Sequence, residues 1–128
     1  MKDVYNPDNE DVMEWVNSSE EKWPASDWDY YVTSCDNDLL IMKLANGLEG
    51  SKKMFFVHAL YYLVGAYFRS SSRKEEKKKR IDSLLSLAER NASPEVTKWR
   101  NETLKLFAGD LEFDLNYWTN YFLITHEA

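Results

Sequence analysis

The sequence contains few of the residues that form covalent cross-links, tight turns and metal sites. Among its 128 residues there are 1 Cys, 4 Gly, 3 Pro and 2 His. The single thiol, Cys35, excludes an internal disulfide and a zinc site built from cysteines. So few Gly and Pro residues disfavour the many tight turns of a β-sandwich or a β-barrel. We therefore expect no metal site, no cofactor and no catalytic residues.

Apolar and aromatic residues are abundant instead. Hydrophobic residues make up 44% of the chain and aromatic residues 15%, with 5 Trp, 8 Tyr and 6 Phe. This composition excludes disorder for most of the chain, and the length suits one ordinary domain. No segment alternates strictly as a β-strand does. We predict a single all-α domain over residues 1–128, a bundle of five or six helices with antiparallel helix hairpins around a central apolar helix at about 52–69.

Capping residues and hydrophobic spacing predict the first helices. One helix is expected to begin near Asn6–Asp8 and to end near 17–19. The stretch 20–35 is the least regular, with Ser26 or Asp27 as the cap of a short helical turn. A helix over about 38–46 follows, and Gly47 is expected to end it in the left-handed conformation.

The run Met54–Phe68 is the most apolar segment of the chain. Fifteen residues are fewer than the roughly 20 that a helix needs to cross a membrane, so we expect the central buried helix of a globular domain, capped by Ser51. The next helix should bury the stripe of Ile81, Leu84, Leu85 and Ala88.

The clearest boundary in the chain follows at residues 91–95. Asn91 is expected to end one helix, while Ser93 caps the next and Pro94 takes its first position. This second helix should stop at Gly109. A final helix is expected to begin at Asp114 and to pack Leu115, Trp118 and Phe122 against the rest.

Charge is divided unevenly along the chain. The formal net charge of −6 separates into −9 over residues 1–50, +7 over 51–100 and −4 over 101–128. An acidic region beside a basic one indicates a charged partner, because summed electric fields steer association.

The acidic region supplies the candidate binding residues. Carboxylates lie there among large aromatic residues, a combination that steers a basic partner and anchors it. The alternative, that the aromatic residues belong to the core and the acids only solvate it, stays open. The candidate partner-binding residues are Glu20, Glu21, Asp27, Trp28, Asp29, Tyr30, Asp36 and Asp38.

Three other sites are less favoured. The run Arg73–Arg80 has six basic residues in eight, but its two glutamates and the acidic pI argue against direct nucleic-acid binding. The acidic cluster at 36–38 lacks the glycine and glutamate of a calcium loop, since Ile41 and Gly47 stand at those positions. His58 has no spaced nucleophile, so a structural role is favoured over a catalytic one.

The middle and C-terminal segments resemble small all-helical bacterial immunity proteins of toxin–immunity systems of the contact-dependent inhibition type. The similarity covers about residues 54–118 and is carried by HALYYLVG (58–65), LLSLAERNASPEVTKWRNET (84–103), Phe113–Asp114 and Tyr117–Trp118. The resemblance implies a cytoplasmic protein that binds one cognate toxin, often a nuclease, and blocks its active site or substrate surface.

The sequence thus predicts a non-enzymatic inhibitor that binds a basic protein toxin through its acidic, aromatic-rich surface. The polar N-terminus, MKDVYNPDNE, lacks the apolar core of a secretory signal, so we expect a cytoplasmic protein that does not bind membranes. The rival hypothesis is a helical adaptor or scaffold that self-associates or binds a partner helix.

Overall fold

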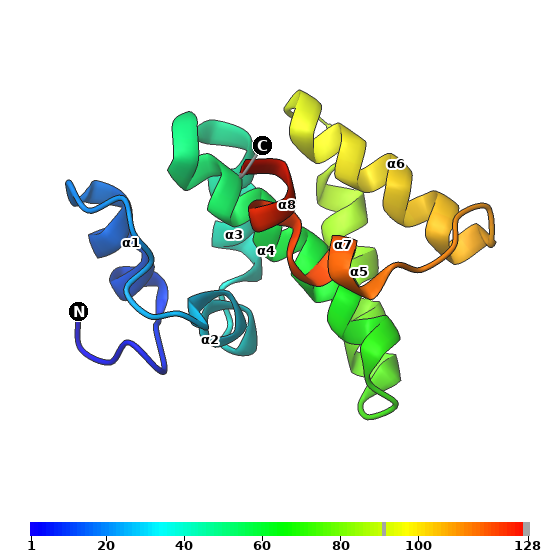
Figure 1. Ribbon diagram of the computed structural model, residues 1–128, viewed down its shortest axis with the longest axis horizontal. Helices are drawn as coiled ribbons and strands as arrows, with labels where there is room; N and C mark the ends of the chain where they lie inside the picture. The colour runs from blue at the N-terminus through cyan, green and yellow to red at the C-terminus, as the bar shows by residue number, and fades with distance from the viewer. Residues whose placement is uncertain (91, 127–128) are drawn as a thin grey trace.

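The computed structural model describes residues 1–90 and 92–126, and this part of the chain is all-helical (Figure 1). The fold class predicted from the sequence is confirmed. In chain order the helices are α1 (Asn9–Asn17), α2 (Trp28–Ser34), α3 (Asp38–Gly47), α4 (Gly50–Arg69), α5 (Lys74–Leu87), α6 (Pro94–Ala108), α7 (Leu115–Thr119) and α8 (Tyr121–His126).

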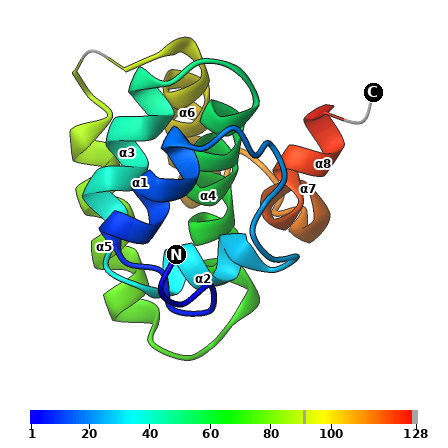
Figure 2. The same cartoon turned by 90° about the vertical axis from the view of Figure 1, so that its left-hand side faces the viewer.

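Helix α4 is the centre of the molecule. All residues from Phe55 to Gly65 are buried, as an apolar helix surrounded by others requires. Helices α3 and α5 lie on one side of α4, and α7 and α8 lie on the other (Figure 2). Helix α1 reaches α4 through Trp15, whose indole contacts the rings of Phe55 and Phe56. In the part of the chain that the structure describes, no helix combines the length and apolarity needed to cross a bilayer.

Several helix ends agree with the sequence analysis. The Asp8 side chain accepts a hydrogen bond from the Asp11 amide and completes a capping box at α1. At α6, Ser93 accepts from the Val96 amide, Pro94 occupies the first turn, and Gly109 ends the helix in the left-handed conformation. The predicted end of the preceding helix at Asn91 lies outside the described residues.

The connection between α3 and α4 differs from the prediction. Gly47 is the last residue of α3 and is not left-handed; Gly50, with φ of 78°, turns the chain instead. Ser51 lies inside the first turn of α4, and the cap is Glu49, which forms no side-chain capping bond. Two glycines within four residues leave the turn position ambiguous in sequence, which explains the error.

The buried stripe of the next helix is confirmed. Ile81, Leu84, Leu85 and Ala88 are all buried. Helices α5 and α6 both pack against α3 and α4. The amphipathic pattern of α5 is therefore explained by the two helices that it covers.

The final helix is divided in two. Asp114 caps α7 as predicted, but α7 ends at Thr119 and α8 starts at Tyr121. Trp118 is buried as expected, whereas Leu115 is exposed and was wrongly assigned to the core. Helix α7 lies close to α4 at Gly65, where an added Cβ would meet Thr119 Cγ2 at 2.8 Å.

Candidate protein-binding surface

The structure separates the eight candidate residues into exposed and internally engaged groups. Glu20, Asp27, Tyr30 and Asp36 are exposed, and the carboxylates among them form no ion pair with a described residue. Glu21 is also exposed, and it accepts a hydrogen bond from the Ser51 hydroxyl. These residues remain available to a partner.

Trp28 does not belong to the surface. It is 0% exposed, and the centroid of its indole lies 5.2 Å from that of the Trp15 indole and 5.3 Å from that of the Phe55 ring. The prediction failed because α2 packs this residue onto α4, and nothing in the local sequence distinguishes a buried tryptophan from an interface one.

Asp29 is engaged with His58 inside the fold. Phe122 donates its backbone N–H to His58 Nδ1 at 3.0 Å, so Nδ1 is unprotonated and Nε2 carries the hydrogen. Nε2 then donates to Asp29 Oδ2 at 2.8 Å. Both ring nitrogens are therefore occupied in joining α2, α4 and α8, which fits the structural role expected for His58. The side chain of His126 lies outside the described residues.

Asp38 is likewise paired within the chain. Its carboxylate accepts two hydrogen bonds from Arg80, at 2.7 and 2.9 Å, while Arg80 also donates to the carbonyl of Thr33. The hydrogen bonds to Asp38 raise the pKa of Arg80. This bidentate pair fastens α5 to the start of α3, so Asp38 has little capacity left for a partner.

Tyr30 belongs to a group of three tyrosines, of which the candidate set missed Tyr5 and Tyr31. The ring of Tyr31 lies 5.2 Å from that of Tyr5 and 5.6 Å from that of Tyr30, both edge-on. Tyr5 is 65% and Tyr30 51% exposed. The Cys35 thiol donates to Asn6 Oδ1, which brings the segment after α2 against the segment before α1.

The tyrosine rings are joined by these contacts, and the exposed Asp27 and Asp36 lie in the chain on either side of α2, which carries Tyr30 and Tyr31. We call Tyr5, Asp27, Tyr30, Tyr31 and Asp36 together the acid–tyrosine surface. Sequence reasoning could not find Tyr5, because it lies more than twenty residues away and joins the others only through the packing of the N-terminal segment.

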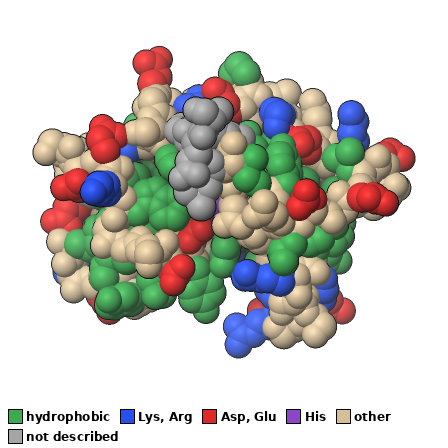
Figure 3. Space-filling model, viewed as in Figure 1, with side chains coloured by type: hydrophobic (Ala, Val, Ile, Leu, Met, Phe, Trp, Pro, Cys, Tyr) green, Lys and Arg blue, Asp and Glu red, His purple; other side chains and the backbone are tan. Residues whose placement is uncertain are grey.

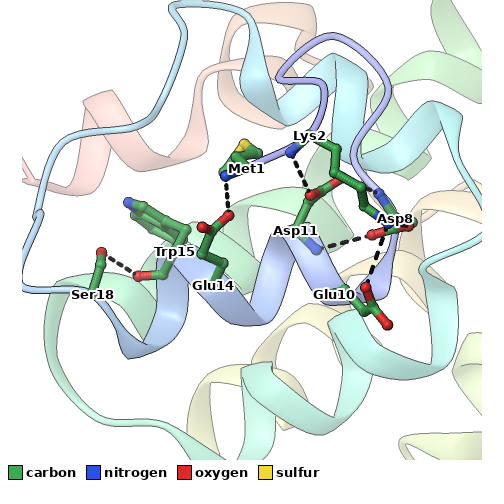
Figure 4. A network of polar contacts seen from close by, with 8 residues as sticks. All are labelled: Met1, Lys2, Asp8, Glu10, Asp11, Glu14, Trp15 and Ser18. Atoms are coloured by element: carbon green, nitrogen blue, oxygen red, sulfur yellow. Dashed lines mark hydrogen bonds and ion pairs between the residues drawn. The ribbon is translucent and has the colours of Figure 1, made fainter.

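Part of the acidity near the N-terminus is neutralised internally (Figure 4). The Lys2 ammonium contacts Asp8 and Glu10, and the terminal amino group pairs with Glu14. The backbone N–H of Asp11 and then Lys2 lower the pKa of Asp8. The negative field that a partner meets therefore depends chiefly on the unpaired carboxylates.

Charge is only partly segregated on the surface. Figure 3 shows acidic side chains over α1 and α2 at the left and again at the right, and a group of basic side chains over the α4–α5 connection at the bottom. The basic run Arg73–Arg80 adjoins the acidic region at one point, because Arg80 pairs with Asp38 at the start of α3.

A second polar cluster joins α4, α6 and α7. Glu102 accepts hydrogen bonds from Tyr61 at 2.5 Å, from Lys98 at 2.8 Å and from Tyr117 at 2.8 Å. Burial alone favours the protonated carboxyl, but these three donors hold the pKa of Glu102 below its usual value. The cluster is internally satisfied, and its geometry indicates a structural role.

Comparisons of the chain with protein-family models, with curated proteins and with solved structures gave no match.

Proposed function

We propose that this protein is a non-catalytic inhibitor of the immunity-protein kind, which neutralises a cognate toxin by binding it through the acid–tyrosine surface. The observation that carries the proposal is that two exposed carboxylates lie on either side of α2, which carries an exposed aromatic ring. Asp27 and Asp36 have no ion pair among the described residues, and Tyr30 lies exposed in the helix between them.

Residues 1–50 carry a net charge of −9, and the negative field of such a region attracts a basic protein and repels an acidic one. Tyrosine provides a large, rigid contact area and is enriched among the residues that dominate binding energy. Together they favour a protein partner with a basic, concave surface.

A nuclease is the toxin class that best fits this chemistry. An enzyme that binds nucleic acid presents a basic cleft to the phosphate backbone, and an acidic protein surface is complementary to such a cleft. The resemblance to immunity proteins points to the same class and to action in the cytoplasm.

The test uses the purified product of the neighbouring reading frame as the partner. We expect a one-to-one complex by size-exclusion chromatography with light scattering, and loss of the partner's nuclease activity at stoichiometric inhibitor. Because Asp29 supports the fold, the informative charge reversal is Asp27→Lys with Asp36→Lys. The matched control, Asp110→Lys with Glu112→Lys, makes the same charge change at exposed positions beyond α6.

A helical adaptor is the second candidate, favoured by a different observation. Leu104, Leu111 and Leu115 each expose 40% or more of their surface on and after α6. Exposed apolar side chains of this kind are typical of self-associating or helix-binding surfaces. A stable homo-oligomer in the same light-scattering experiment, with no complex formed, would favour the adaptor over the inhibitor.

A further inference from the structure

A cleft of about 430 Å³ lies between α2, the C-terminal half of α4 and the first turns of α5. Its volume falls within the range of small-molecule sites, roughly 300–1,000 Å³. Tyr30 and Tyr62 line it together with Thr33, Ser34 and Ser70. The hydroxyls of Thr33 and Ser34 donate to carbonyls of α2.

The cleft is basic although the protein is acidic. Arg69, Arg73, Lys77 and Arg80 line it, against one carboxylate from Glu76. Only Arg80 forms an ion pair within the described chain, with Asp38. Like charges gathered around one concavity repel each other, and a bound anion relieves that repulsion.

Two of the three cations without an ion pair, Arg69 and Lys77, are held by neutral groups. Arg69 donates to the Tyr62 hydroxyl at 3.2 Å and lies over the Tyr62 ring, and Lys77 donates to the Ser72 carbonyl at 2.9 Å. These contacts orient both charges without neutralising them. An arginine fixed in this way presents the planar fork that recognises phosphate oxygens.

The backbone at Arg73 points to the same function. With φ of 52°, it is the one non-glycine residue in the left-handed region among the described residues. It is also the N-cap of α5, where an arginine side chain has no acceptor for the first amides and forms no capping bond. Strained residues of this kind concentrate at ligand sites.

We propose that this cleft binds a phosphate-bearing small molecule of nucleotide size. The phosphate would lie among Arg69, Arg73 and Lys77, and the planar ring would lie against Tyr30. A small ligand is favoured over a nucleic acid because the cleft lies between three helices, and the acidic side chains over α1 and α2 repel a long polyanion.

The test titrates the full-length protein with inorganic phosphate, pyrophosphate, AMP and ATP, and follows amide resonances by NMR. We expect saturable shifts in the residues that line the cleft. Arg73→Gln should weaken pyrophosphate and ATP binding about tenfold, as expected for the loss of one charged hydrogen-bond donor. Tyr30→Ala should weaken AMP and ATP binding while leaving pyrophosphate binding unchanged.

Lys79→Gln is the matched control, because it removes one positive charge from an exposed position of α5 outside the cleft. Equal losses in Arg73→Gln and Lys79→Gln would overturn the proposal, as would the absence of saturable shifts at millimolar concentration. A single-stranded RNA that binds more tightly than ATP, with Lys79→Gln as harmful as Arg73→Gln, would identify a general basic face and also overturn it.

Discussion

The imidazole of His58 donates a hydrogen bond to Asp29 at 2.8 Å across the interface between α4 and α2. Since the other ring nitrogen accepts the Phe122 amide, one side chain joins three segments that are far apart in sequence. His58 is 1% exposed, so neither bond is easily replaced by water. An acidic residue that looked like part of a binding surface is thus a structural element.

This relationship predicts different stabilities for two aspartate variants of one segment. Asp29→Ala leaves the buried Nε2–H of His58 without an acceptor and should lower the free energy of unfolding by about 1–3 kcal/mol. Asp27 is the N-cap of α2, but its exposed side chain forms no capping bond and no ion pair with a described residue, so Asp27→Ala should change the free energy of unfolding by less than about 0.5 kcal/mol. Urea denaturation of both variants measures the difference. Coincident unfolding curves would show that the Asp29–His58 bond contributes nothing to stability.

The contact of α7 with α4 predicts the effect of a methyl group. Gly65→Ala places a Cβ 2.8 Å from Thr119 Cγ2 and 3.3 Å from Trp118 Cβ, so α7 must shift. We expect a loss of about 1–3 kcal/mol. Gly47→Ala is the matched control, because an added Cβ there meets nothing within 4 Å, and it should be neutral or slightly stabilising. Thermal unfolding compares the two variants. A Gly65→Ala variant more stable than Gly47→Ala would contradict the close contact between α7 and α4.

The Glu102 cluster predicts a loss of stability in acid. Because the pKa of Glu102 is lower in the folded protein than in the unfolded chain, the unfolded chain binds more protons as the pH falls. The stabilisation is complete above the usual glutamate range and is lost as the pH drops through and below it.

Glu102→Gln keeps an acceptor for the tyrosines but cannot titrate. Its stability deficit relative to wild type should be largest near neutral pH and should shrink in acid, as measured by urea denaturation over a pH series. A deficit that stays constant with pH would mean that Glu102 does not titrate with folding.

The left-handed backbone of Arg73 predicts that this residue lowers the stability of the fold while it contributes to anion binding in the cleft. Arg73→Gly removes the steric penalty at φ 52° and should raise the free energy of unfolding by about 1 kcal/mol, while it removes a cation from the cleft. Lys79→Gly, in the interior of the same helix, should instead lose roughly 0.5–1 kcal/mol. Chemical denaturation distinguishes the two. If Arg73→Gly were as destabilised as Lys79→Gly, Arg73 would not be strained.

The all-helical fold was accessible from the sequence because its signals are local. Asp8, Ser93 with Pro94, and Gly109 act within one turn of the helix that they begin or end. The apolar run around Phe55–Gly65 likewise predicts a helix that other helices surround. The break between α7 and α8 at Asn120 was not predicted. Its position depends on how the two helices pack against α4, and the local sequence pattern carries no information on that packing.

The candidate surface was only partly accessible for the same reason. Composition identified the acidic, aromatic region, but the fold decides which members face solvent. Trp28 is covered by α4. Asp29 accepts a hydrogen bond from His58, and Asp38 accepts from Arg80. Tyr5, which is distant in sequence, contacts the ring of Tyr31. Each of these outcomes depends on contacts between residues more than twenty positions apart.

The central claim is that the acid–tyrosine surface binds a basic protein toxin. Its most direct test is the association rate constant of the purified chain with the product of the neighbouring reading frame, at low and at physiological ionic strength. We predict that Asp27→Lys with Asp36→Lys slows association about tenfold or more at low salt, and that Asp110→Lys with Glu112→Lys does not. Equal rates for the two double variants, or no binding by the wild-type protein, would contradict the account.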